Sequence, residues 1–102
     1  MMLLMMAYAA MATTNPMEVR LQRAYRAAPR PVRRFLERRA GCNHWGGEEA
    51  YDAERAQQIA QAIRGLRCDR LEADERWLKR QYARSRRVRW LLSATRERDI
   101  MP

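Results

Sequence analysis

The stretch CNHWGGEEAYDAERAQQIAQAIRGLRC, residues 42–68, decides how this chain folds. It begins and ends at the only two cysteines, and its second half has the apolar spacing of an amphipathic helix. Asp52 is a suitable N-cap for that helix, which we expect to run to about Arg67. The face that this helix should bury consists of Ala56, Ile59, Ala60, Ile63 and Leu66.

Helical spacing recurs on both sides of this stretch, and no run of β-branched residues alternates with period two. Pro29 separates two expected helices on the N-terminal side, and Ser85 is a suitable N-cap for the last helix. Asp69, with Glu72 three residues later, resembles a capping box for the helix between them. The expected helices cover residues 18–28, 31–40, 52–67, 69–84 and 85–95. The sequence therefore predicts an all-α fold, a small single-domain bundle of about five short helices.

The core of this bundle must be small, because the chain has 102 residues and its apolar stripes are narrow and rich in Ala. The other residues expected to face inward are Leu21, Ala24, Tyr25, Ala28, Val32, Phe35, Leu36, Leu71, Leu78, Tyr82, Val88, Leu91, Leu92 and Thr95. In an exported chain, Cys42 and Cys68 would form a disulfide. Closing that loop of about 27 residues would stabilise the fold by about 3.5 kcal/mol in the chain-entropy model. Two free thiols and a metal site are the alternatives for this pair.

The first 12 residues, MMLLMMAYAAMA, form an apolar run without a charged side chain. They end in AMA, a small-x-small pattern of the kind cleaved by signal peptidase, although no basic residue precedes the run. We interpret residues 1–12 as a signal peptide and 13–17 as a linker before one helical domain over 18–102. A mis-assigned start, upstream or at Met17, and a short interfacial anchor are the alternatives. The run is too short to cross a bilayer as a helix, which takes about 20 residues.

The net charge of +9 comes from 21 Lys+Arg against 12 Asp+Glu, and all but one of the cations are Arg. Residues 18–41 carry +6, residues 42–68 carry −1 and residues 69–102 carry +4. Because Arg makes planar, bidentate contacts and stacks on aromatic rings, the two basic blocks favour an anionic partner. A composition bias of the genome would explain the same excess without a function. The candidates for a basic surface are Arg23, Arg26, Arg30, Arg76, Arg80, Arg84 and Arg86.

Two tryptophans lie away from the apolar stripes of their helices. Trp90 is close in sequence to Arg86, Arg87 and Arg89, and Trp77 lies beside the stripe that contains Leu78. A surface that binds nucleic acid is one interpretation of such a pattern. We favour a cation–π contact, or burial of the helix on two sides.

The segment from Cys42 to Asp52 is the most distinctive part of the chain. For zinc, Cys42, His44 and Cys68 would supply three ligands where a structural site takes four. A Cys42–His44 nucleophile pair lacks a third group to orient it, and the loop carboxylates lack a cleft for glycoside hydrolysis. We therefore expect a structural and binding loop whose glycines permit the turn, with no catalytic residue, metal or cofactor. The binding-loop candidates are Asn43, His44, Trp45, Gly46, Gly47, Glu48, Glu49, Tyr51 and Asp52.

Phe35-Leu36-x-x-Arg39, followed by the pattern Cys-x-His-Trp-x-Gly-Glu from Cys42 and by the distal Cys68, resembles small uncharacterised exported proteins of bacteria. More loosely, it resembles the lysozyme-inhibitor-like family of small, helical, disulfide-bonded periplasmic or lipoprotein domains. In that family an aromatic-Leu-x-x-x-Arg stretch precedes a cysteine. The resemblance covers residues 21–68, although Cys42 comes slightly early and most members carry more cysteines. It implies export, a Cys42–Cys68 disulfide and a non-catalytic binding role.

These features together predict a small exported, non-catalytic binding domain that contacts an envelope component or a partner protein through residues 42–54. The acidic cluster of that loop is Glu48, Glu49, Asp52 and Glu54. A chain of charge +9 would be repelled by a basic lysozyme unless this cluster made the contact. The expected location is periplasmic or secreted, with a protein or anionic envelope component as partner and no transmembrane span. The alternative is a cytoplasmic basic helical module that binds nucleic acid.

Overall fold

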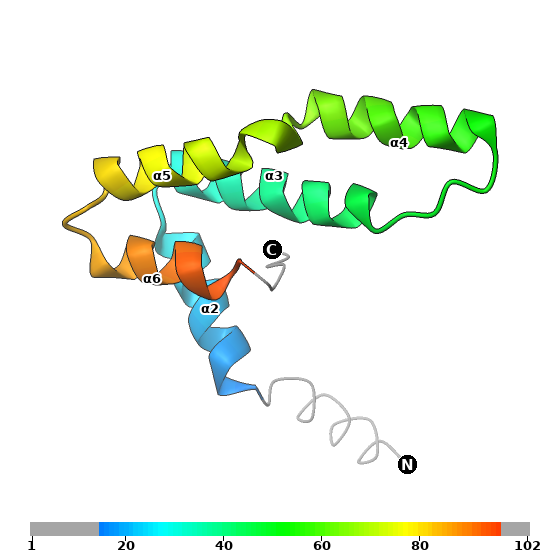
Figure 1. Ribbon diagram of the computed structural model, residues 1–102. Helices are drawn as coiled ribbons and strands as arrows, with labels where there is room; N and C mark the ends of the chain where they lie inside the picture. The colour runs from blue at the N-terminus through cyan, green and yellow to red at the C-terminus, as the bar shows by residue number, and fades with distance from the viewer. Residues whose placement is uncertain (1–14, 97–102) are drawn as a thin grey trace, which may run out of the picture.

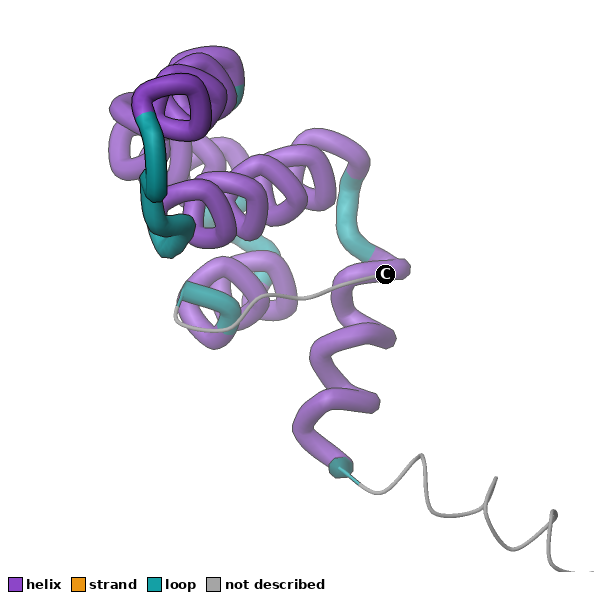
Figure 2. The backbone as a smooth tube through the Cα atoms, turned by 90° about the vertical axis from the view of Figure 1, so that its right-hand side faces the viewer, coloured by secondary structure: helices purple, strands orange, loops and turns teal. Residues whose placement is uncertain are grey.

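The computed structural model describes residues 15–96, which form five α-helices and one short 3₁₀-helix and contain no strand. These elements are α2 (Pro16–Ala27), α3 (Arg30–Gly46), α4 (Ala53–Gly65), the 3₁₀-helix η1 (Cys68–Arg70), α5 (Leu71–Gln81) and α6 (Arg86–Ala94). In Figure 1, α4 and α5 follow each other along α3, and α6 lies below α5. Figure 2 shows α2 running steeply across the other helices. The prediction of an all-α fold is confirmed, whereas the candidate leader at 1–12 lies outside the described residues.

One apolar cluster joins α2, α3, α5 and α6 and forms the core of the protein. Its buried members are Leu21, Ala24, Tyr25, Ala28, Val32, Phe35, Leu36, Leu78, Val88, Leu91 and Leu92. Thr95 is buried as predicted, whereas Leu71 and Tyr82 are only partly buried against the cluster. Tyr25 also joins α2 to α3, because its hydroxyl donates a hydrogen bond to Glu37. Burial, followed by this hydrogen bond, raises the pKa of Tyr25 above its ordinary value of 10.0.

Side-chain caps fix where three of the helices begin. The side chain of Asn15 accepts a hydrogen bond of 3.0 Å from the backbone N–H of Met17 at the start of α2. The N-caps predicted at Asp52 and Ser85 are confirmed: Asp52 accepts from a backbone N–H of α4 at 2.7 Å, and Ser85 accepts from one of α6 at 3.2 Å. Each cap satisfies an N–H group that has no partner within the first turn of its helix. The chain therefore marks these starts locally.

The capping box predicted at Asp69 is wrong. Asp69 lies inside η1, and α5 begins at Leu71 without a side-chain cap. The cause is a turn just before η1, where Arg67 adopts the left-handed conformation with φ of 54°. This turn sets the direction of the chain from α4 into α5, so the helix begins after the residue that the pattern indicates.

α3 is longer than the sequence predicts, because it continues through Gly41 to Gly46. Cys42 and the four residues after it are therefore helical, and the connection to α4 is limited to residues 47–52. Gly41 permits a close approach between the two helices: a Cβ there would lie 3.0 Å from a methyl carbon of Leu66. Packing against α4 thus outweighs the weak helix propensity of glycine. Neither Gly46 nor Gly47 has a positive φ. The prediction that the conformational freedom of these glycines is required for the turn is therefore also wrong.

α4 lies outside the core, which corrects the prediction that its apolar face is buried. No residue of α4 is buried. Ile59, Ile63 and the following Leu66 are half-buried, whereas Ala56 and Ala60 are exposed. The helix packs against α3 and η1, and its N-terminal end extends beyond the other helices (Figure 1). A single neighbouring helix cannot cover the whole apolar stripe.

The disulfide between Cys42 and Cys68 closes the base of the α3–α4 hairpin, with the two Cα atoms 5.7 Å apart. It joins the C-terminal part of α3 to the start of η1, just after α4. Because α4 contributes no buried residue, this covalent link is the main constraint that holds the hairpin closed.

We expect the double variant Cys42→Ser/Cys68→Ser to lose up to about 3.5 kcal/mol of unfolding free energy, because the unfolded chain is no longer constrained. Amide hydrogen exchange in residues 53–65 should accelerate more than exchange in α6, since α4 has no buried residue to keep it in place. Urea titration and exchange mass spectrometry measure the two effects. The wild-type protein with and without a thiol reductant is the control. A change below about 0.5 kcal/mol with unaltered exchange would contradict this account.

Candidate anion-binding site

Four arginines from two helices gather around Trp90. Arg20 and Arg23 come from α2, and Arg86 and Arg87 come from the first turn of α6. With Ala24 and Trp90 they line a pocket of about 480 Å³ between the two helices. The arrangement exists because α2 packs across α6 through Leu21, Ala24, Val88 and their neighbours in the core, which leaves the polar edges of both helices facing each other.

Arg20 is held against the aromatic ring. Its guanidinium carbon lies 4.3 Å from the centroid of Trp90, whose side chain is half-buried. A cation over an indole face is attracted by the quadrupole of the ring. The predicted cation–π contact at Trp90 is therefore present, but its partner comes from α2 and not from the arginines that neighbour Trp90 in sequence.

The four arginines form no ion pair with any carboxylate of residues 15–96. Guanidinium groups stay protonated at all physiological pH values. The pocket therefore concentrates about four positive charges that nothing in the described part of the chain neutralises. Such a site attracts anions and binds them with charge-assisted hydrogen bonds.

The structure brings together two of the seven basic-surface candidates and adds two residues that the sequence prediction missed. Arg23 and Arg86 line the pocket, and Arg20 and Arg87 join them. The remaining candidates lie on other surfaces: Arg26, Arg30, Arg76, Arg80 and Arg84. Arg20 could have been predicted from the sequence, because it lies one helical turn before Arg23 and therefore on the same face of the helix. The pairing of α2 with α6 depends on tertiary packing and has no signal in the sequence.

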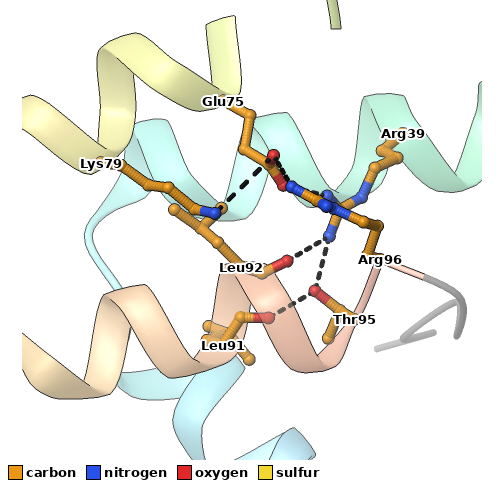
Figure 3. A network of polar contacts seen from close by, with 7 residues as sticks. All are labelled: Arg39, Glu75, Lys79, Leu91, Leu92, Thr95 and Arg96. Carbon is orange, nitrogen blue, oxygen red and sulfur yellow. Dashed lines mark hydrogen bonds and ion pairs between the residues drawn. The ribbon is translucent and has the colours of Figure 1, made fainter. Parts of the chain in front are cut away.

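α6 is fixed in place by Arg39 of α3 (Figure 3). The buried guanidinium donates hydrogen bonds to Glu75 of α5 at 2.7 Å, to the backbone carbonyl of Leu92 at 3.0 Å and to the hydroxyl of Thr95 at 2.7 Å. The Thr95 hydroxyl in turn donates to the carbonyl of Leu91. This network ties the C-terminal half of α6 to two other helices, and so it sets the position of the arginines at the opposite end of α6.

The carboxylate of Glu75 also faces Arg96 and Lys79, the latter at 3.9 Å. Burial alone raises the pKa of Glu75, but the hydrogen bond from Arg96 and the charges of Lys79, Arg96 and Arg39 outweigh it. The pKa of Glu75 is therefore held below its ordinary value of 4.5. The side chain is a structural anion at neutral pH.

The predicted binding loop makes mostly internal contacts. The ring of Trp45 lies under Arg55 of α4, with the guanidinium carbon 5.2 Å from the ring centroid. Glu48 lies 3.3 Å from both His44 and Arg55, so it links the end of α3 to α4. Arg55 is not among the predicted loop residues, because it lies in α4 and not in the loop. Tyr51 differs from these residues, since 80% of its surface is exposed at the tip of the hairpin.

Trp77, the second tryptophan outside an apolar stripe, lies at a different groove from Trp90. Trp77 is 49% exposed beside a groove that includes Arg30, and Asp74 in that groove pairs with Arg38 at 2.6 Å.

The metal and nucleophile interpretations of the cysteines do not apply to this structure, because both thiols are joined in the disulfide. Among residues 15–96 there is no group of three His, Cys, Asp or Glu side chains able to hold a metal ion. None of the described helices is long and apolar enough to span a membrane.

Comparisons with known proteins identify no relative: no family model, no curated protein and no solved structure matches this chain. The resemblance to lysozyme-inhibitor-like proteins therefore stays a prediction.

Acid should destabilise the protein through Glu75. Because the pKa of this carboxyl is depressed in the folded state, its contribution is complete above 4.5 and is lost as pH falls through the folded-state value. We expect unfolding free energy to decrease below pH 4.5, and Glu75→Gln to be less stable at neutral pH with a shallower acid dependence. Urea titrations across this pH range test the expectation. Glu72→Gln, at an exposed position of the same helix, is the matched control; an acid dependence that Glu75→Gln leaves as steep as in the wild type would contradict it.

Proposed function

We propose that this protein is a small, disulfide-stabilised, non-catalytic binding domain that holds an anionic partner on its arginine-rich surface. The observation that carries the proposal is the pocket between α2 and α6, where four unneutralised arginines surround Trp90. Arginine binds and orients anions through its fork of N–H donors, and its guanidinium does not lose its charge at neutral pH. These side chains are therefore suited to recognition and not to acid–base chemistry.

An oxidising compartment is part of the proposal. The Cys42–Cys68 pairing supports it, because structural disulfides persist mainly in the periplasm, the secretory route and the extracellular space. The apolar run at residues 1–12 supports it as a candidate signal peptide. In that setting the available anions are envelope lipids, glycans and acidic proteins. A cytoplasmic nucleic-acid-binding module remains the alternative, and the aromatic ring in the pocket is the feature that favours it.

The tip of the α3–α4 hairpin is a second proposed contact surface, for a protein partner. Tyr51 is almost fully exposed there, and tyrosine is enriched among residues that dominate binding energy at protein interfaces. Glu49 and Glu54 are exposed in the same segment, so the tip is acidic in a chain whose net charge is +9. This separation of charge suits two different partners.

Binding to polyanions tests the main proposal. Heparin, a dT oligonucleotide and vesicles with anionic phospholipid are titrated with the oxidised full chain between about 50 and 200 mM salt. We expect affinity for at least one of them to fall steeply with salt, with a log–log slope near −3 for the oligonucleotide if four charges are engaged, about −0.7 per phosphate contact.

Two variants that remove the same charge locate the contact. Arg23→Gln/Arg86→Gln should reduce the salt slope by about half, because each variant residue removes about one phosphate contact. Arg76→Gln/Arg80→Gln, at exposed positions of α5, should leave the slope near that of the wild type. Absence of binding to all three polyanions at low salt would refute the proposal.

Expression with the native N-terminus tests the compartment. We expect the mature product to lack residues 1–12 and to be lighter by two hydrogen atoms than its reduced form, because export and oxidation go together. Intact mass before and after reduction measures both. The Cys42→Ser/Cys68→Ser variant is the control for the mass change on reduction. An uncleaved, reduced, cytoplasmic product would contradict the export part of the proposal and leave the anion-binding part to the titrations.

A further inference from the structure

The first turn of α6 has an unfavourable charge distribution for a helix. Arg86 and Arg87 occupy its first two positions, and no acidic residue lies in that turn. The N-terminal end of a helix carries a partial positive charge, so cations there destabilise it whereas anions stabilise it. Arginines at this end therefore act against the stability of α6 unless an anion is bound beside them.

The backbone strengthens the same feature. Ser85 accepts the N–H of Val88, but the N–H groups of Arg86 and Arg87 have no acceptor among residues 15–96. Unpaired N–H groups and the helix dipole together favour phosphate at a helix N-terminus. Here a second, independent element is present, because α2 places Arg20 and Arg23 on the opposite wall of the same pocket.

Arg20 is also oriented in advance. Its guanidinium is stacked over Trp90 at 4.3 Å, which restricts its position while its N–H edge stays available. Ordering a long side chain is one of the costs of binding, so an arginine that is already held in place loses less freedom when an anion arrives. Bidentate contact between such a fork and two phosphate oxygens is the favoured geometry.

The number of charges indicates the size of the anion. A terminal phosphate group carries about −1.5 to −2 at neutral pH, and each phosphate linked behind it adds about −1, so a diphosphate or triphosphate moiety roughly matches the four arginines. A carboxylate brings one charge, and four separate carboxylates would have to converge on one pocket of about 480 Å³. Two other large pockets are less suitable for an anion, because carboxylates line them. The pocket at Trp77 includes Asp74, and the pocket at Arg39 includes Glu72 and Glu75.

We propose that the pocket between α2 and α6 binds adjacent phosphate groups, a diphosphate or triphosphate moiety, between Arg20 and Arg23 on one side and Arg86 and Arg87 on the other. This inference rests on the proposed function and makes it specific. The moiety can be free oligophosphate or part of a nucleotide, and both offer the same chemistry to the arginines. An acidic peptide is the competing occupant.

Calorimetric titration of the oxidised full chain with tripolyphosphate tests the inference. At equal ionic strength we expect tripolyphosphate to bind at least about tenfold more tightly than inorganic phosphate or a tetraglutamate peptide, because more charge-assisted hydrogen bonds form. ATP is the second phosphate probe: affinity above that of tripolyphosphate assigns the nucleotide as the source, and equal or lower affinity assigns the free oligophosphate.

The variant Arg86→Gln/Arg87→Gln should lose at least about tenfold in affinity for tripolyphosphate. Its melting temperature without ligand should be equal to or above that of the wild type, because two cations leave the positive end of α6. This second readout shows that the variant is folded. The matched control Arg76→Gln/Arg80→Gln removes the same charge from α5 and should keep the wild-type affinity.

Each contrary result has a distinct meaning. If heparin binds but tripolyphosphate does not bind more tightly than inorganic phosphate, the inference fails and the proposed function stands. Equal losses in both double variants would show diffuse attraction and would also overturn the inference. If tetraglutamate binds as tightly as tripolyphosphate, the pocket takes an acidic peptide instead. If no polyanion binds at low salt, the proposed function and the inference fail together.

Discussion

The buried guanidinium of Arg39 is the interaction on which the arrangement of this protein depends. The side chain extends from α3, and its guanidinium pairs with Glu75 of α5. It also donates hydrogen bonds to the backbone carbonyl of Leu92 and to the hydroxyl of Thr95 at the end of α6. Burying a charge costs several kcal/mol unless its partners are in place, so these three helices must meet in one register. Apolar contacts in a small core are not directional and would tolerate other registers. Arg39 thus selects one packing, and through α6 it sets where Arg86 and Arg87 lie.

The hairpin of α3 and α4 depends on a different constraint. Its second helix has no buried residue, so apolar burial contributes little to keeping it in place. The Cys42–Cys68 bond, the approach of Leu66 to Gly41 and the contacts of Arg55 with Trp45 and Glu48 hold it together. Stability is therefore uneven: a core of four helices is held by packing and the Arg39 network, and an attached helix is held by covalent and polar links.

Local signals in the sequence predicted most of the fold. Asp52 and Ser85 could be identified as caps because capping involves only the next few residues. The apolar faces of α2, α3 and α6 followed from spacing, whereas the face of α4 was predicted to be buried because spacing alone does not tell whether a partner helix is present. Arg67 was missed because its left-handed turn depends on how α4 meets α5. The candidate site was half predictable: Arg23 and Arg86 belong to basic stretches, but their meeting depends on the crossing of α2 and α6.

The distribution of acidic residues determines the position of the site more than the distribution of arginines does. Arginines are spread along α2, α3, α5 and α6, but the ion pairs among residues 15–96 involve α3, α4, α5, residue 48 and residue 96. Asp74 and Glu75 neutralise arginines on the α3–α5 side, and Glu48 does so at the hairpin. Within the described part of the chain, no carboxylate forms an ion pair with the arginines of the groove between α2 and α6. Because charges in a pocket repel one another at close range, the four arginines that line this groove concentrate an unneutralised part of the net charge of +9. An anion bound there, as proposed, would relieve repulsion among the arginines and at the start of α6 at once, so ligand binding would be coupled to the stability of that helix.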